Sequence, residues 1–402
     1  MPNSIGLALV LVGGLTAVYV GLVQGSAVLI GGKLTVFQGH PFVWWSQLSF
    51  VCLLLLPLAV GVFSNYPIVD ILRDVIPHIF LFIPLFFFSR FVQMPSVWIQ
   101  RFSLALSAVG VALAVRFLLI ATPSLDVIGT GHYGYDEKLV LAADPAILFA
   151  AIYLPLMAAD RLRSANLGDW FVSAMAIVGA LTCLAAFGAK LARGPFFLSA
   201  FAYILYTLVT VKASFVRVVF IAVGGVVLFV LLKDPILGVV DLLIEKQLRV
   251  GDNAKIDEFR AVLISADTSL WTALFGRGWG ALIDNPFRGT QFSFTHSIFS
   301  YYLAKAGVVG LALICMYLLL FIRPVMALWW NDRPLFFATI FGVLYPFLFQ
   351  PTFKVMTTGL IMALALGAGV QSMGGGLSGN AVSKVQVKSF EKRDKNVQGE
   401  CR

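Results

Sequence analysis

The residues best suited to chemistry lie at the end of one long polar stretch. Residues 233–295 are rich in charge, glycine and aromatic side chains, and the chain then re-enters an apolar segment through Thr295-His296-Ser297. A histidine at the outer end of a membrane span meets water and titrates near neutral pH, so His296 is suited to general-base catalysis. The alternative for such a histidine is a capping or interface-anchoring role.

Two glycine patterns flank this histidine. Upstream, Phe275-Gly276-Arg277-Gly278-Trp279-Gly280 places three glycines within five residues. Glycine permits positive φ and close backbone approach, which suits a site for a bulky ligand, although a plain helix stop is the more frequent meaning. Arg277 between two glycines is a candidate for substrate contact or for simple solvent exposure. Downstream, Gly307-Val308-Val309-Gly310 forms a seam that lets a neighbouring helix or lipid chain approach closely.

The polar stretch itself predicts two short helices. Residues 236–249 carry apolar side chains at helical spacing, which indicates a helix lying along the membrane surface or against the bundle. Residues 255–274 predict a second helix that ends at the glycine pattern. Asp257, Glu258 and Asp267 are left open between a functional role and a role as structural partners of the loop arginines.

Composition places these elements in a membrane. The chain has 402 residues, of which 59% are hydrophobic and only 12% are charged, and its mean hydropathy is +0.91. Ordinary soluble domains carry roughly 25% charge, so we expect an all-α polytopic membrane protein. Eleven apolar segments are long enough to cross a hydrocarbon core of about 30 Å, and ten or twelve spans remain open. They lie near residues 5–31, 42–63, 75–93, 102–122, 139–158, 170–189, 195–211, 214–232, 297–322, 335–350 and 352–371.

Basic residues in short loops predict the orientation, because Lys and Arg stay on the cytoplasmic side during insertion. With eleven spans, one side receives Lys33, Arg101, Arg161, Arg163, Lys212, Arg217, Arg323, Arg333 and the basic residues after Lys384. We therefore expect a periplasmic N-terminus, a cytoplasmic C-terminus and a periplasmic 233–296 loop. The predicted organisation is an N-terminal bundle over 1–232, the loop over 233–296, C-terminal helices over 297–371 and a disordered tail over 372–402.

Several functions are not supported by the sequence. Cys52, Cys183, Cys315 and Cys401 show no paired spacing for a disulfide framework or a zinc site. There is no phosphate-binding glycine loop, no metalloprotease motif and no internal repeat of the transporter kind. The net charge of +9 belongs mainly to cytoplasmic loops and the tail, so anionic lipid headgroups are expected partners and nucleic acid is not. We expect no metal and no cofactor.

Two arginines, Arg116 and Arg90, fall inside apolar spans, and Arg90 near the inner end of the 75–93 span is expected to snorkel to the cytoplasmic face. Arg116 lies within the 102–122 segment, where a charge costs at least about 2.5–3.5 kcal/mol at the bilayer centre. Such a residue is a functional-site hypothesis by default, and Arg116 is a candidate for lining a substrate path. Snorkelling or pairing with an acidic loop residue explains it equally well.

The order and spacing of these motifs resemble a known family. His296-Ser297, then nine residues, then Gly307-x-x-Gly310 after a large loop resembles the signature of the O-antigen ligase and O-antigen polymerase superfamily. The Phe275–Gly280 pattern resembles that family's aromatic-glycine corner, and Arg193-Gly194 resembles its Arg-Gly start of an earlier span. The resemblance covers roughly residues 180–350, and outside the His motif the basic loop residues match only loosely.

The resemblance implies a metal-independent, inverting membrane glycosyltransferase of the GT-C type in the bacterial inner membrane. It would use a glycan on undecaprenyl pyrophosphate as donor, with His296 taking the proton from an acceptor sugar hydroxyl. Arg193, Arg260 and Arg288 are the candidates for holding the anionic leaving group, because guanidinium binds phosphate bidentately. Arg277, Arg116, Ser297, Gly307 and Gly310 are the further candidates for the substrate site.

The particular reaction stays open. A ligase passes the finished glycan to a glycolipid acceptor in lipopolysaccharide biosynthesis, whereas a polymerase passes it to another lipid-linked repeat, as in O-antigen or exopolysaccharide assembly. The His-Ser form slightly favours the ligase. A lipid-linked glycan transporter or flippase is the alternative from another class. It is disfavoured because the polar residues gather in one asymmetric loop instead of paired broken helices.

Overall fold

The computed structural model describes residues 41–121, 143–162, 166–190, 192–210, 253–285, 290–293 and 295–373. The predicted spans 5–31 and 214–232, the surface helix 236–249 and the tail lie outside these residues, as does Arg288. The described part of the chain is a helical membrane bundle with one short hairpin. Six of its helices are long and apolar enough to cross a membrane, and two shorter apolar helices accompany them.

The first half of the described chain contributes seven helices and the second half the remainder. In chain order these are α2 (Pro41–Phe63), α3 (Ile68–Leu81), α4 (Ile83–Gln93), α5 (Ser96–Ala121), α8 (Pro145–Arg161), α9 (Leu167–Ala189) and α10 (Arg193–Thr210). Then follow α12 (Asn253–Ala266), α13 (Leu270–Phe275), β1 (Ile283–Asn285), β2 (Thr290–Phe292), α14 (Ile298–Asn331), α15 (Arg333–Leu348), the short 3₁₀ helix η2 (Pro351–Lys354) and a last helix, Met356–Met373.

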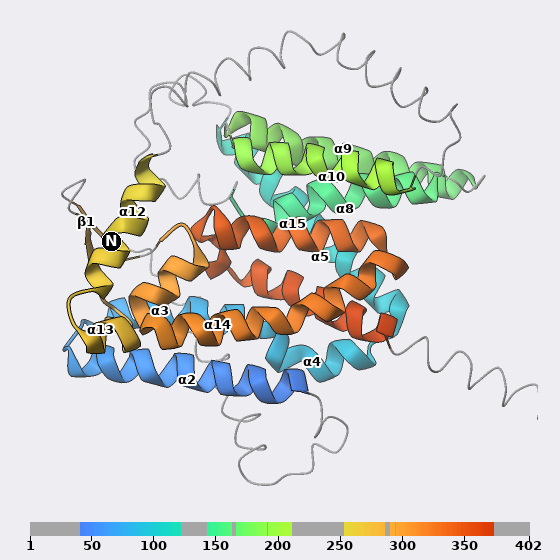
Figure 1. The fold of residues 1–402 in the computed structure, drawn as a ribbon. Helices are drawn as coiled ribbons and strands as arrows, with labels where there is room; N and C mark the ends of the chain where they lie inside the picture. Colours follow the sequence, from blue (N-terminus) through green and yellow to red (C-terminus); the bar gives the residue numbers. More distant parts are fainter. Residues whose placement is uncertain are drawn as a thin grey trace, which may run out of the picture.

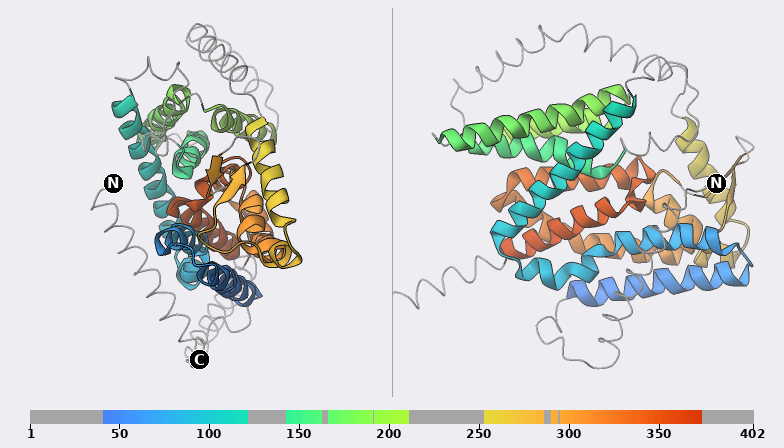
Figure 2. Two further views of the ribbon diagram at one scale, coloured as in Figure 1. Left: turned by 90° about the vertical axis from the view of Figure 1, so that its left-hand side faces the viewer. Right: turned by 180° about the vertical axis from the view of Figure 1, so that it is seen from behind.

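Two apolar cores hold the bundle together. One surrounds α8, whose side chains are buried on nearly every face and which packs against α5, α9 and α15. The other lies between α2, α3 and α14. In Figures 1 and 2 the short helices α12 and α13 and the hairpin gather at one end of the long helices. We call this the loop end of the bundle.

The helix at residues 68–88 begins earlier than the sequence predicts. The expected span was 75–93, with the charged residues before it in a loop, whereas the structure has α3 from Ile68 and a break at Phe82 before α4. The reason is local neutralisation. Asp70 and Arg73 pair with each other at 2.5 Å, and Asp74 is buried against a lysine of α14. Hydropathy along one segment does not reveal a partner on a distant helix.

The polar stretch is also divided more finely than predicted. The expected helix over 255–274 is two helices, because Ser269 caps α13 by accepting a hydrogen bond from Thr272 N. Residues after the glycine pattern form an unpredicted antiparallel hairpin, in which Ile283 pairs with Phe292. These elements lie against the start of α14 and bring the loop's polar side chains to it.

Candidate functional site

A histidine–carboxylate pair lies where the polar stretch meets α14. The Nδ1 atom of His296 lies 2.5 Å from Oε2 of Glu258, and the backbone N–H of His296 donates to Oε1 of the same carboxylate at 2.9 Å. Because an ionised carboxylate only accepts hydrogen bonds, Nδ1 carries a proton, and in the neutral imidazole Nε2 then keeps its lone pair. The His296 side chain is 42% exposed and that of Glu258 only 11%. The pair therefore presents an oriented imidazole base to the surface.

Local structure fixes both partners. Glu258 lies one helical turn before Val262 on α12, and Val262 packs with Ile283 of β1 and Ala304 of α14. On the histidine side, Thr295 Oγ1 donates to the Ser297 carbonyl at 2.8 Å, and Ser300 Oγ donates to Thr295 Oγ1 at 2.9 Å. Ser297 caps α14, accepting from Phe299 N at 3.3 Å. The predicted Ser297 thus shapes the turn that holds His296.

The Phe275–Gly280 segment packs against the kink in α14. Gly307 has a φ of 67° and interrupts the helix, which separates the first turns of α14 from the rest. The carbonyls of Ala304 and Lys305, which a regular helix would use internally, accept instead from Arg277 N at 3.0 Å and Gly278 N at 2.9 Å. Gly276, Gly278 and Gly280 all have positive φ. The expected glycine corner is therefore a tightly bonded joint between the loop and α14.

Trp279 anchors the same corner to α2. Its backbone N–H donates to the Pro57 carbonyl at 2.9 Å, and its indole Nε1 donates to the Leu54 carbonyl at 3.2 Å. The side chain is fully buried. Gly61 lies so close that a Cβ there would overlap the Trp279 carbonyl oxygen. The corner is thus fixed on two helices at once.

A second charged cluster lies just beneath this corner. Asp74 of α3 is fully buried and accepts from Lys305 Nζ at 2.6 Å, from Gly280 N at 2.9 Å and from Tyr301 Oη at 3.1 Å. Lys305 also donates to the Ala281 carbonyl at 2.5 Å. This ion pair ties α3, α14 and the glycine corner together.

Lys354 of η2 completes the cluster from the other side. Its ammonium lies 3.8 Å from Asp74 Oδ1 and 4.1 Å from the ring centroid of Tyr301. Burial lowers the pKa of Lys354 to about 7, although the Asp74 charge raises it in part. One carboxylate therefore lies between two lysines at the loop end.

The predicted arginines are not all brought to His296. Arg260 is exposed on α12, and side chains two positions apart on a helix do not face each other, so it does not share the face on which Glu258 meets His296. Arg116 is exposed on α5, whose main packing partners are α8 and α9. Arg277 is half-buried within the glycine corner beside α14. Arg193 begins α10, where the next residue, Gly194, packs against Tyr345 of α15.

The glycine seam serves two purposes. Gly307 makes the kink. A Cβ at Gly310 would overlap Ala306 Cβ across the kink, and would meet Leu53 Cδ2 of α2 at an ordinary contact distance of 3.4 Å. At Gly307, glycine is needed because the backbone has a positive φ and lies against Leu274 and against Gly276 of the glycine corner.

Sequence reasoning missed the members of the buried cluster. Lys305 stands inside an apolar segment, and an intramembrane charge is a signal worth following. Asp74 falls one residue before the predicted 75–93 span, and no role was predicted for it or for Lys354. A structural pairing with loop arginines was one of the roles left open for Glu258, whereas the structure pairs it with His296.

The fold and the composition define a helical, multi-pass membrane protein. Comparison with protein-family models, curated proteins and solved structures finds no match for this chain. Among the described residues, no three His, Cys, Asp or Glu side chains gather closely enough to hold a metal ion.

Proposed function

We propose that the protein is a membrane glycosyltransferase that moves a glycan from undecaprenyl pyrophosphate to an acceptor sugar hydroxyl. The observation that carries the proposal is the His296–Glu258 pair, a half-exposed imidazole whose proton is fixed on Nδ1 by a buried carboxylate. The resemblance of its sequence surroundings to O-antigen ligases and polymerases supplies the reaction class. The topology predicted from basic loop residues puts this end at the periplasmic face.

The reaction balances with His296 as general base. The acceptor hydroxyl gives its proton to Nε2 of His296, and its oxygen bonds to the anomeric carbon of the donor sugar. The bond from that carbon to the pyrophosphate breaks on the opposite face, and its electron pair leaves with undecaprenyl pyrophosphate. The configuration at the anomeric carbon is inverted. Glu258 stabilises the imidazolium that forms and holds the ring in place.

Cationic side chains at the same end suit the leaving group. Pyrophosphate gains negative charge as the bond breaks, and a guanidinium stabilises it through paired hydrogen bonds. Arg277 is the stronger candidate, since its backbone is held on α14 and its side chain is half-buried. Arg193, at the start of α10, and Arg288 remain proposed phosphate contacts. Arg260 has less support, because it lies on a different face of α12 from Glu258.

Surface glycan analysis in a deletion strain tests this proposal. The strain is complemented with the wild type, His296→Ala or Arg193→Ala, and acceptor-bound glycan is resolved from glycan left on the lipid carrier. Loss of attachment with long lipid-linked chains accumulating establishes a ligase. Accumulation of single repeat units establishes the polymerase alternative. Unchanged glycans in both variants refute the catalytic proposal and favour the transporter or an unrelated role.

A further inference from the structure

A cavity lies at the end of the bundle opposite the loop end. It has a volume of about 470 Å³ and is lined by residues at the ends of α8, α10 and α14 and at the starts of α5 and α15. His296 precedes the first residue of α14, whereas Asp332 follows its last. The 24 residues of α14 after the kink at Gly307 rise about 36 Å on their own, so the cavity is separate from the proposed transfer site.

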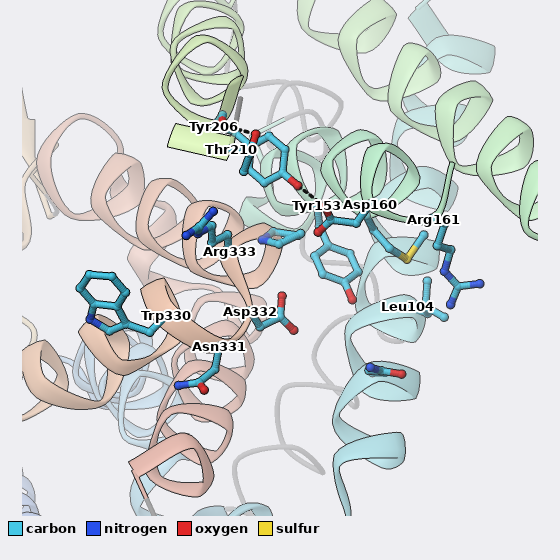
Figure 3. A pocket seen from close by; sticks show the side chains of 13 residues that line it. Leu104, Tyr153, Asp160, Arg161, Tyr206, Thr210, Trp330, Asn331, Asp332 and Arg333 are labelled. Atoms are coloured by element: carbon cyan, nitrogen blue, oxygen red, sulfur yellow. Dashed lines mark hydrogen bonds between the residues drawn. The ribbon is translucent and has the colours of Figure 1, made fainter. Parts of the chain in front are cut away.

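Two carboxylates share this cavity. Asp160 accepts from Tyr206 Oη at 2.6 Å, and Asp332 caps α15 by accepting from Leu335 N at 3.0 Å. Figure 3 shows both carboxylates directed into the space between α8 and the α14–α15 turn. Burial raises the pKa of Asp332, and the charge of Asp160 raises it further. Like charges in one partly desolvated space repel each other, and an ammonium that donates hydrogen bonds to both carboxylates offsets that repulsion.

Guanidinium groups also line the cavity. Arg333 donates through Nε to the Trp329 carbonyl at 3.4 Å, so its two terminal amino groups are the donors suited to an anion. Arg161 also lines the cavity, and its Nη1 lies 3.9 Å from Asp169 Oδ1. The lining thus combines a place for a cation with a place for an anion. That combination fits a zwitterion better than either ion alone.

The cavity lies at the depth of lipid headgroups. Trp330 on its rim is 76% exposed, and Trp98, two residues before the lining residue Gln100, is also exposed. Arg101 stacks on Trp98 at 4.9 Å from the ring centroid. Exposed tryptophans beside basic residues mark the membrane–water interface. A zwitterion that meets the protein at this depth is a phospholipid headgroup.

We propose that this cavity binds the phosphoethanolamine headgroup of a membrane phospholipid, with the ammonium between Asp160 and Asp332 and the phosphate on Arg333. A primary ammonium donates three hydrogen bonds to carboxylate and phenol oxygens, whereas a choline ammonium donates none. The site therefore selects ethanolamine over choline. This lipid site is independent of the proposed glycosyl transfer and is tested without any activity measurement.

Photo-crosslinking in nanodiscs tests the site. The full-length protein is reconstituted with a photoactivatable phosphatidylethanolamine or the matched phosphatidylcholine probe, and crosslinked peptides are identified by mass spectrometry. The ethanolamine probe is expected to label peptides of the α8 end and the α14–α15 turn, and the choline probe is not. Equal labelling of these peptides by the two probes overturns the proposal.

Variants sharpen the same experiment. Asp332→Asn keeps a cap for α15 and Asp160→Asn keeps an acceptor for Tyr206, while each removes a charge-assisted hydrogen bond worth about 1.5–3 kcal/mol. Labelling is expected to fall about tenfold or more in each. Asp70→Asn, at the loop end, is the control and retains labelling. Unchanged labelling in both cavity variants refutes the site, and equal elution volumes and thermal midpoints confirm that the variants are folded.

A last arm distinguishes a lipid from a soluble ligand. Free phosphoethanolamine is added to nanodiscs that contain the ethanolamine probe. It carries the same headgroup chemistry without acyl chains, so it is expected to compete weakly. Complete competition at a concentration equal to that of the probe overturns the assignment to a lipid.

Discussion

Two carboxylates at the loop end, Asp74 and Glu258, each meet a basic side chain, yet their surroundings differ. Asp74 is fully buried and accepts hydrogen bonds from a lysine, a tyrosine and a backbone N–H. Glu258 holds His296 by two contacts, and the His296 side chain is 42% exposed. The first pair has its groups satisfied from within the protein, whereas the second leaves one nitrogen for an outside molecule.

This contrast separates a pair with a structural role from a pair with a proposed catalytic role, and the two lie within a few helical turns of each other. A buried ion pair with all its donors used holds helices in register, and removing one partner leaves an uncompensated charge. A half-exposed base oriented by a buried carboxylate has the arrangement of a general base. The two pairs are joined through α14, because Lys305 lies in its first turns and His296 lies two residues before its first residue, Ile298. Substitutions at the Asp74 pair are therefore expected to lower stability, whereas substitutions at the Glu258 pair are expected to lower activity.

The largest expected effect is on activity at Glu258. Glu258→Gln keeps an acceptor for the His296 backbone, but its amide N–H faces Nδ1 and drives the imidazole proton to Nε2. The base nitrogen is then occupied, and kcat for glycosyl transfer is expected to fall about 10²–10⁴-fold with KM unchanged. Asp257→Asn on the same helix is the control. Equal activity of Glu258→Gln and wild type in reconstituted vesicles would show that Glu258 does not orient the base.

The largest expected effect on stability is at Asp74. Asp74→Asn leaves Lys305 without its counter-charge in a buried position, which is expected to cost about 3–5 kcal/mol of unfolding free energy. Asp70→Asn, in a partly exposed pair with Arg73, is expected to cost about 1 kcal/mol or less. Thermal unfolding in detergent, followed by circular dichroism, compares the two. A cost at Asp74 no greater than at Asp70 would remove the structural role assigned to the buried pair.

An intermediate effect on stability is expected at Gly307, where α14 is kinked beside Lys305. Gly307→Ala puts a Cβ on the Leu274 carbonyl and 2.6 Å from Gly276 N, at a φ of 67°. With a ψ of −162°, this backbone conformation is essentially restricted to glycine and costs an alanine about 1–3 kcal/mol. The overlap costs about 1–3 kcal/mol more. Gly188→Ala in α9 is the matched control, since its Cβ meets nothing within 4 Å. A Gly307→Ala protein as stable as Gly188→Ala would contradict the rigid joint.

The pH dependence of stability tests the lysine side of the buried cluster. The folded pKa of Lys354 is lowered from 10.5 to about 7, so between these values the unfolded chain binds more protons than the folded one. The contribution of Lys354 to the free energy of unfolding therefore rises with pH across that window, by about 2 kcal/mol from pH 7 to pH 9. Lys354→Met is expected to flatten the rise in thermal midpoint. A slope identical to that of the wild type would show that Lys354 titrates normally.

The smallest expected effect distinguishes the loop arginines. Arg277→Ala is expected to lower kcat for transfer about tenfold, since it removes a charge-assisted contact to the leaving group. Arg260→Ala, on another face of α12, is expected to change kcat by less than about threefold. Both are measured in the same vesicle assay as Glu258→Gln. A larger loss of kcat in Arg260→Ala than in Arg277→Ala would indicate that Arg260 contacts the phosphate and that Arg277 has only a structural role.

The sequence predicts more of the helices than of their contacts. Spans over 42–63, 170–189 and 335–350 correspond closely to α2, α9 and α15, because apolar length is a local property. The kink at Gly307 and the burial of Asp74 depend on partners more than two hundred residues away in the chain or on backbone dihedrals. His296 was found from its position at a span end. Glu258 was not linked to it, because nothing in a single sequence pairs residues 38 positions apart.

The most direct test of the account measures transfer by purified protein in proteoliposomes. The donor is an undecaprenyl-pyrophosphate glycan, the acceptors are a glycolipid and a second lipid-linked repeat, and the anomeric configuration of the product is read by NMR. The account predicts that the wild type transfers with inversion and releases undecaprenyl pyrophosphate, whereas folded His296→Gln does neither. Transfer by His296→Gln at the wild-type rate, or intact donor moved across the membrane without bond cleavage, would contradict it.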